Sequence, residues 1–172
     1  QYREEFAEQV PHVEELHNLY KVLQKARAER GALEFETTET RIVFDAERKI
    51  EEIVPVTRND AHKLIEECML MANVATARYL KWHKMPILYR VHESPQEDRL
   101  KNLRTFLGDF GLTLEGGDTP TAHDFAEVAN KVKGEPHEHL VQTVLLRSMN
   151  QAVYQPDNKG HFGLNYEHYA HF

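Results

Sequence analysis

Cysteine is almost absent from this sequence of 172 residues, because Cys68 is the only one. No intramolecular disulfide can form, which favours a reducing compartment, and we expect a cytoplasmic protein. No apolar run approaches the ~18 residues that a membrane helix needs, so we expect no membrane association. The opening residues, QYREEFAEQV, lack the layout of a signal peptide and give no indication of export. The length and a hydrophobic content of 41% predict one globular domain, with residues 1–172 as a single region.

Positive charge is also scarce. The chain has 21 Lys and Arg against 28 Asp and Glu, which gives a net charge of −7 with neutral histidines. Nucleic-acid binding depends mainly on Lys and Arg that neutralise phosphates. Composition therefore argues against this chain, taken alone, being a general nucleic-acid binder.

Motifs for metal and phosphate binding are missing, although the chain has eleven histidines. Zinc sites need three or four ligands with compact spacing. His137 with His139, and His168 with His171, are closely spaced, but no HExxH or Cys/His pattern accompanies them. There is no glycine-rich phosphate loop, and no Asp cluster of the kind that holds two magnesium ions. We therefore interpret the histidines as surface or hydrogen-bonded residues rather than metal ligands, and expect no metal bound by this stretch.

Periodicity and capping residues predict an α+β fold. Helical spacing of apolar residues predicts five helices, at about 8–30, 60–83, 96–111, 121–133 and 136–149. Alternating residues predict two or three antiparallel strands over about 32–56, a short strand at 87–93 and a closing strand at 161–166, with a turn at 154–158.

The helix predicted over 60–83 is unusual because its segment CMLMANVATA (68–77) is apolar nearly all round. A helix with apolar residues on every side is normally buried on every side. We therefore expect helices packed around a central buried helix, accompanied by a small antiparallel hairpin.

Three residues stand out, and each has a structural alternative. Asn73 is a polar residue in the predicted buried helix, where its amide needs hydrogen-bond partners, and we favour a helix-to-loop clamp over a site role for it. Glu66 lies seven residues earlier on the same helical stripe, and it is either a site carboxylate or a solvated one. Phe35 falls in the predicted strands, where core packing is the usual role.

The segments RNDAHKLIEECMLMANVATARYL, LYRVHE, LLRSMNQAVYQPDNKGHFGL and YEHYAHF occur in one consistent order. Together they resemble the catalytic, RNB-type domain of the bacterial ribonuclease R and ribonuclease II family. The motifs LYRVHE and YAHF follow the ribonuclease R pattern more nearly. Several long motifs in register, spread over the whole chain, make this resemblance specific.

The resemblance implies processive hydrolysis of single-stranded RNA from its 3′ end, with release of nucleoside 5′-monophosphates and with Mg²⁺ as cofactor. It also implies that these 172 residues are the middle of the catalytic domain. The metal-binding aspartates and the catalytic arginine of the family would then lie outside them, so we expect no catalytic residue here and no activity of this stretch alone. A noncatalytic relative that keeps the fold to bind RNA or protein is the alternative.

The same resemblance assigns roles to particular residues. Phe35 matches a phenylalanine that stacks on the terminal bases, and Glu66 matches a glutamate near the terminal ribose. Glu67 takes that role if the register shifts by one residue. Lining of the site is implied for Asn73, His161, Phe162 and Gly163. The histidine- and aromatic-rich end of the chain, NKGHFGLNYEHYAHF, is then one wall of an RNA site.

Overall fold

The computed structural model describes residues 2–35, 39–56 and 58–172. The predicted α+β class is confirmed, with helices as the main component and two separate two-stranded antiparallel sheets. The helices are α1 (Tyr2–Glu5), α2 (Val10–Arg30), α3 (Asp60–Trp82), α4 (Glu97–Asp109), α5 (Ala122–Lys131) and α6 (Glu138–Ser148). The strands are β1 (Glu39–Phe44), β2 (Ile50–Val56), β3 (Tyr89–Val91) and β4 (Val153–Gln155). No described helix is long and apolar enough to cross a membrane.

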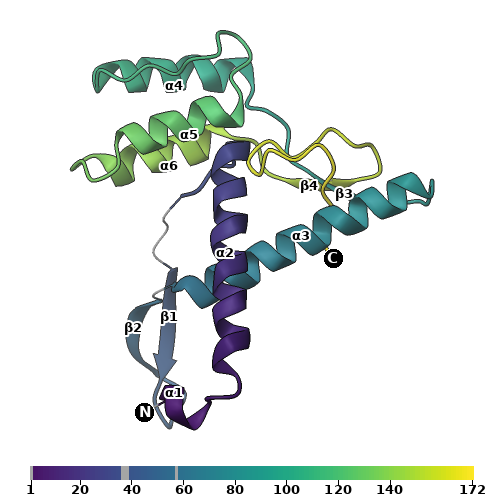
Figure 1. The fold of residues 1–172 in the computed structure, drawn as a ribbon. Helices are drawn as coiled ribbons and strands as arrows, with labels where there is room; N and C mark the ends of the chain where they lie inside the picture. The colour runs from purple at the N-terminus through teal and green to yellow at the C-terminus, as the bar shows by residue number, and fades with distance from the viewer. Residues whose placement is uncertain (1, 36–38, 57) are drawn as a thin grey trace.

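Helices α4, α5 and α6 lie together at one end of the molecule, α2 runs away from them, and α3 packs against α2 (Figure 1). The amphipathic faces of α4–α6 enclose the largest core. Its buried residues include Leu103, Leu107, Phe125, Val141 and Leu145, each with 1% or less of its surface exposed. Leu33, just after α2, joins the same core and so fixes the end of α2 against it.

The ends of α2 and α3 follow the signals in the sequence. Helix α2 stops at Gly31, whose φ of +71° is a left-handed conformation that glycine adopts without strain. Helix α3 is capped by Asn59, whose side chain accepts a hydrogen bond from the backbone N–H of His62 and whose own backbone N–H donates to Nδ1 of the His62 ring. This reciprocal pair is a capping box, which satisfies two otherwise unpaired donors.

The prediction that α3 is buried on every side is wrong for the part of the chain that the structure describes. One stripe of α3 is buried, formed by Glu67, Leu70, Asn73, Val74 and Ala77. The opposite side is exposed, with Ile65 at 67%, Met69 at 43% and Met71 at 41%. The apolar segment therefore crosses the middle of the molecule, but α2 and the C-terminal segment cover only one side of it.

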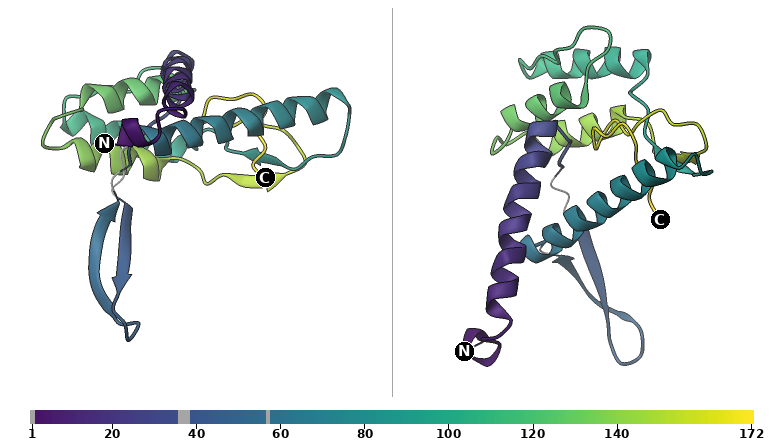
Figure 2. Two further views of the ribbon diagram at one scale, coloured as in Figure 1. Left: turned by 60° about the horizontal axis from the view of Figure 1, so that its bottom comes forward. Right: turned by 45° about the vertical axis from the view of Figure 1, so that its right-hand side comes forward.

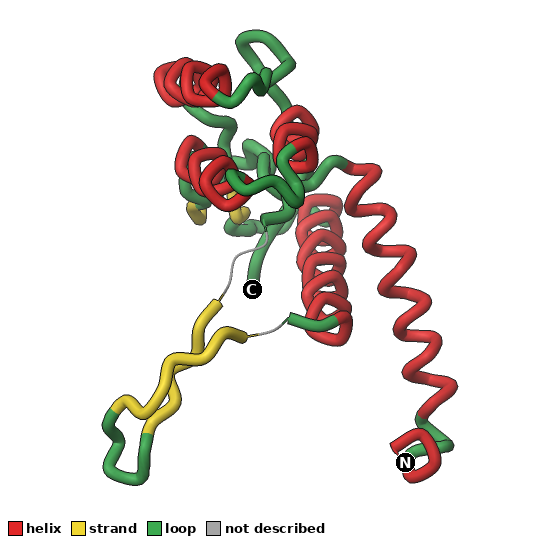
Figure 3. The backbone as a smooth tube through the Cα atoms, turned by 90° about the vertical axis from the view of Figure 1, so that its left-hand side faces the viewer, coloured by secondary structure: helices red, strands yellow, loops and turns green. Residues whose placement is uncertain are grey.

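The β1–β2 hairpin stands away from the helices, as Figures 2 and 3 show from three directions. Strands occupy only part of the predicted 32–56 range: residues 32–35 form no strand, and 36–38 lie outside the described residues. Apolar side chains on both strands are exposed, including Phe44 at 57%, Ile50 at 60% and Ile53 at 59%. An isolated two-stranded hairpin is only marginally stable in water.

Two predictions near the C-terminus are wrong. Residues 161–166 form a turn closed by single bridges from His161 to Tyr166 and to His92, not a strand. Tyr154 and Gln155, predicted as part of a turn, belong to β4 and pair with β3. Neither segment has the long apolar alternation that predicts a strand from sequence. Residues 153–155 form a strand because they pair with β3, whereas residues 161–166 make only single bridges.

Candidate nucleic-acid interface

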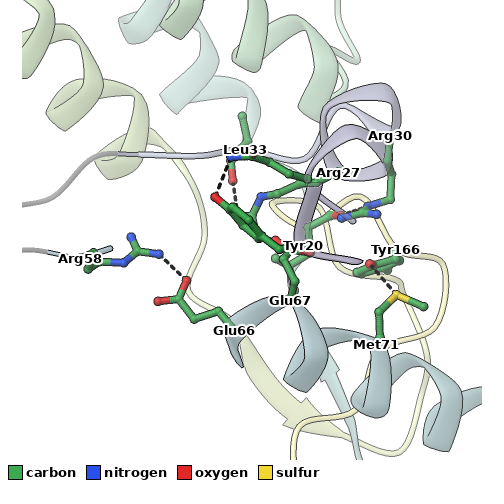
Figure 4. Close-up of polar contacts among 11 residues, drawn as sticks. Tyr20, Arg27, Arg30, Leu33, Arg58, Glu66, Glu67, Met71 and Tyr166 are labelled. Carbon is green, nitrogen blue, oxygen red and sulfur yellow. Dashed lines mark hydrogen bonds and ion pairs between the residues drawn. The ribbon is translucent and has the colours of Figure 1, made fainter. Parts of the chain in front are cut away.

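Two arginines in the last turns of α2 connect it to the rest of the molecule. The Nη1 atom of Arg27 donates to Oε1 of Glu67 on α3 at 2.6 Å, and Nη2 donates to the carbonyl of Leu33 at 3.3 Å (Figure 4). Only 17% of the Arg27 side chain and 7% of the Glu67 side chain are exposed. Arg27 therefore connects α3 directly to the segment that leads to Phe35.

Arg30 makes the corresponding connection to the C-terminal segment. Its Nε donates to the carbonyl of Leu164 at 2.9 Å, and its guanidinium lies 4.0 Å from the centre of the Tyr166 ring. The backbone N–H of Leu33 donates to the carbonyl of Gly163 at 2.8 Å. The end of α2 thus joins three segments that are far apart in the sequence: 30–35, α3 and 161–166.

The two adjacent glutamates of α3 have different environments. Glu67 is 5% exposed and committed to Arg27, so its carboxylate cannot reach a ligand without breaking a buried ion pair. The Glu66 side chain is 41% exposed and pairs with Arg58, just before α3 (Figure 4). Of the two, Glu66 is the carboxylate that a ligand can approach.

Phe35 is half-buried and packs against the core of α4–α6. It lies after α2 in a segment without secondary structure, not on a strand as predicted. Its core contacts agree with the alternative of a packing role, and its remaining exposure leaves part of the side chain open to solvent.

Asn73 is 1% exposed, and its contacts are those of a helix-to-loop clamp. Its Nδ2 donates to the hydroxyl of Tyr169 at 3.2 Å and lies 3.4 Å from Nδ1 of His171. The Tyr169 hydroxyl is 3.0 Å from the same Nδ1. This small network holds the C-terminal segment on α3.

The three residues His161, Phe162 and Gly163 pack inward against His92. Gly163 donates its N–H to Nδ1 of His92 at 3.1 Å, and a Cβ added at Gly163 would lie 3.0 Å from that atom. The Phe162 ring packs edge-on against Phe125 of the main core, with centroids 5.5 Å apart. A side chain at 163 would therefore require the His92 ring to shift by a few tenths of an ångström.

Burial of the His161 ring lowers its pKa to about 4, and the neighbouring His92 contributes in the same direction. Burial also lowers the pKa of His92. Both rings are therefore neutral near pH 7, and Nδ1 of each accepts a backbone N–H. These two histidines act as uncharged packing and hydrogen-bonding groups.

The structure brings the segments that carry Phe35, Glu66 and Gly163 to one junction, whereas Asn73 lies two turns further along α3. The residues that make this junction, Arg27 and Arg30, are the two basic residues in the last turn of α2. Basic residues in a last helical turn are common, and nothing in the spacing indicated which carboxylate or carbonyl they would contact.

The described residues do not fit a magnesium site. No group of three or more His, Cys, Asp or Glu side chains among them could hold a metal ion. The adjacent carboxylates Glu66 and Glu67 each pair with an arginine instead. No step of a metal-dependent reaction can be assigned to this stretch.

Comparison with known proteins shows the family and the fold. The RNB domain family matches residues 2–172. Ribonuclease R of Vibrio parahaemolyticus is 56% identical over 99% of this chain, and ribonuclease R of Escherichia coli is 51% identical over 99%. The chain spans 20% and 21% of these relatives, about a fifth of their length.

Solved structures show the same fold. The apo form of Mycoplasma genitalium RNase R superimposes with a TM-score of 0.89 at 28% identity, over 95% of this chain and 26% of that one. The same enzyme in complex with ribose-methylated single-stranded RNA gives 0.88 at 28% identity, with the same coverage of both chains. Yeast Ssd1, described as a pseudonuclease, gives 0.58 at 23% identity over 67% of this chain and 15% of that one, which shows the fold alone. The chain therefore belongs to the RNB domain family, to which its ribonuclease R relatives belong.

Proposed function

We propose that the complete protein is a processive 3′-to-5′ exoribonuclease that degrades single-stranded RNA to nucleoside 5′-monophosphates. The observation that carries this proposal is the identity of 51–56% to ribonuclease R over nearly all of the chain. In this proposal residues 1–172 are one region, the middle part of the RNB-type catalytic domain. Mg²⁺ is then a cofactor of the complete protein in a cytoplasmic setting, and it is not held by the described residues.

Within this proposal, Phe35 and Glu66 contact the 3′ end of the strand. Phe35 stacks on a terminal base, which suits an enzyme without sequence preference because every base has a π-face. Glu66 accepts a hydrogen bond from the terminal ribose, since an ionised carboxylate is an acceptor and the 2′-hydroxyl is a donor. The connection of both segments through Arg27 supports this pairing. The proposed lining of the site consists of Asn73, His161, Phe162 and Gly163.

A noncatalytic relative is the second candidate, since the fold is shared with a protein described as a pseudonuclease. Catalysis separates the two candidates. The complete protein, purified free of other nucleases, is incubated with 5′-labelled RNA and Mg²⁺. Stepwise shortening from the 3′ end is expected, and RNA binding without shortening would favour the noncatalytic candidate.

Glu66→Ala in the complete protein tests the assigned site. A hydrogen bond to a charged group contributes about 1.5–3 kcal/mol, which corresponds to about ten- to a hundredfold. DNA lacks the 2′-hydroxyl, so the variant is expected to lose more affinity for RNA than for a matched oligomer with a deoxyribose end. Binding and cleavage of both oligomers are measured.

Arg58→Ala is the matched control, because it removes the ion-pair partner but keeps the carboxylate. It is expected to retain the preference for RNA. Equal losses of Glu66→Ala on both oligomers, or the same loss of preference in Arg58→Ala, would contradict the ribose contact.

A further inference from the structure

The C-terminal end of α3 differs in charge from the rest of the chain. Residues 68–92 contain Arg78, Lys81, Lys84 and Arg90 and no Asp or Glu, in a chain with a net charge of −7. This end of α3 lies with β3 and β4, away from the β1–β2 hairpin at the other end of the helix (Figure 1). A local cationic surface on an acidic chain indicates a binding partner that is negatively charged.

Aromatic rings are exposed on the same helix end. Trp82 is 82% exposed and Tyr79 is 57% exposed. The ring of His83 lies between them, with its centroid 4.4 Å from that of Tyr79 and 5.7 Å from that of Trp82. A tryptophan this exposed has little packing to hold it in place, whereas its flat face is available for stacking.

A groove of about 540 Å³ opens at the same end of α3. It is lined by Lys81, Lys84, the residues Met85–Tyr89, and Pro156. The described lining thus combines two ammonium groups with an apolar floor and includes no carboxylate. Lys81 also contacts His168, so Lys84 is the better residue for a test of charge.

We propose that this surface, defined as Tyr79, Trp82, His83 and the groove lined by Lys81, residues 84–89 and Pro156, binds single-stranded RNA outside the 3′-end site. Cations that neutralise phosphates and rings that stack on bases, side by side, are the two components of single-strand binding surfaces. Glu66 and Trp82 are sixteen residues apart on α3, about 24 Å at 1.5 Å per residue, so the two sites are separate. The proposal does not depend on catalysis by the complete protein.

Trp82 is the only tryptophan of the chain, which makes it a direct reporter. The 172-residue chain, with its helical content checked by circular dichroism, is titrated without magnesium with an unstructured RNA oligomer and with an RNA duplex. Quenching of Trp82 fluorescence by the single strand, and much less by the duplex, is expected. Quenching by an acidic peptide but not by RNA would overturn the proposal in favour of a protein partner.

Variants separate stacking from charge, with binding measured by anisotropy of a labelled oligomer. Trp82→Ala is expected to bind about tenfold more weakly, and Trp82→Phe to retain most of the affinity. Lys84 has a φ of +54°, so Lys84→Asn removes the charge with a residue that tolerates this conformation. It should reduce the slope of log K against log salt by about 0.7. Tyr2→Ala, which removes another exposed ring at 77% exposure, should change neither quantity.

The same variants in the complete protein give a measurement that does not require the isolated chain to fold. Trp82→Ala and Lys84→Asn should weaken the binding of a long single strand and leave the degradation of an oligomer too short to span both sites unchanged. Equal effects on long and short RNA, or none on either, would overturn the proposal. If the unaltered complete protein degrades no RNA, this result would contradict the proposed exoribonuclease function but not the proposal that this surface binds RNA.

Discussion

Phe35 has both a packing role and a proposed binding role, because it is half-buried against the core and half-open to solvent. Phe35→Leu separates them, since leucine keeps an apolar side chain but has no face on which a base can stack. In the complete protein we expect binding of the RNA end to weaken by about 1–3 kcal/mol and the final product to change in length. Product lengths on a denaturing gel and the melting temperature are measured.

A variant with unchanged product lengths and a lowered melting temperature would show that Phe35 only packs. A variant with unchanged melting and altered products would support the stacking role alone.

His161 makes stability depend on pH in a defined direction. Its pKa is about 4 in the folded chain against about 6.5 when unfolded, so the unfolded state takes up a proton first as the pH falls. The contribution of neutral His161 to the free energy of unfolding is fully present above pH 6.5 and is lost between pH 6.5 and pH 4. From pH 7.5 to pH 5 the free energy of unfolding falls by about 2 kcal/mol through this group.

His161→Asn should flatten this part of the profile, because asparagine can keep an acceptor near the position of Nδ1 and does not titrate. Urea unfolding at pH 5, 6 and 7.5 checks it. An equally steep dependence in the variant would show that another group causes it.

At the scale of elements, α2 is attached to α3 by the Arg27–Glu67 pair. Arg27→Ala would leave the Glu67 carboxylate buried without its partner, which costs about 3–5 kcal/mol of unfolding free energy. Changing both residues, Arg27→Met with Glu67→Leu, should recover most of this loss because no buried charge remains. Chemical denaturation of the single and double variants provides the measurement.

Arg3→Ala is the control for that experiment, since the Arg3–Glu14 pair has side chains that are 80% and 56% exposed. An exposed pair contributes at most about 1 kcal/mol. A double variant as unstable as Arg27→Ala would show that packing of the Arg27 side chain, not the buried charge, holds the two helices together.

At the scale of the whole molecule, the 172-residue chain is expected not to degrade RNA. Its described residues contain no cluster that could hold a metal, so they would position no metal ion to stabilise the charge that develops on a phosphate. A labelled oligoribonucleotide with Mg²⁺ should remain full length when incubated with the chain and be shortened by the complete protein. Stepwise shortening by the chain itself would contradict this expectation.

The sequence by itself determined the five longer helices, α2 to α6, and the family. Asn59, Gly31 and the apolar spacing define helix boundaries through local hydrogen bonds and backbone conformation, which need no distant partner. The ordered motifs identified the RNB domain family because they extend over nearly the whole chain. The sequence did not determine the secondary structure of residues 161–166 or the exposure of one side of α3, because both depend on contacts with residues that are distant in the sequence.

Only the tertiary structure decided which of two adjacent glutamates is accessible. Consecutive residues of a helix point about 100° apart, so Glu67 faces α2 and pairs with Arg27, whereas Glu66 faces outward toward Arg58. The apolar pattern around 68–77 predicts burial on every side, but it does not show which segments pack against each side of the helix. Burial depends on what packs against a surface, and in this chain α2 and the C-terminal segment cover only one stripe of α3.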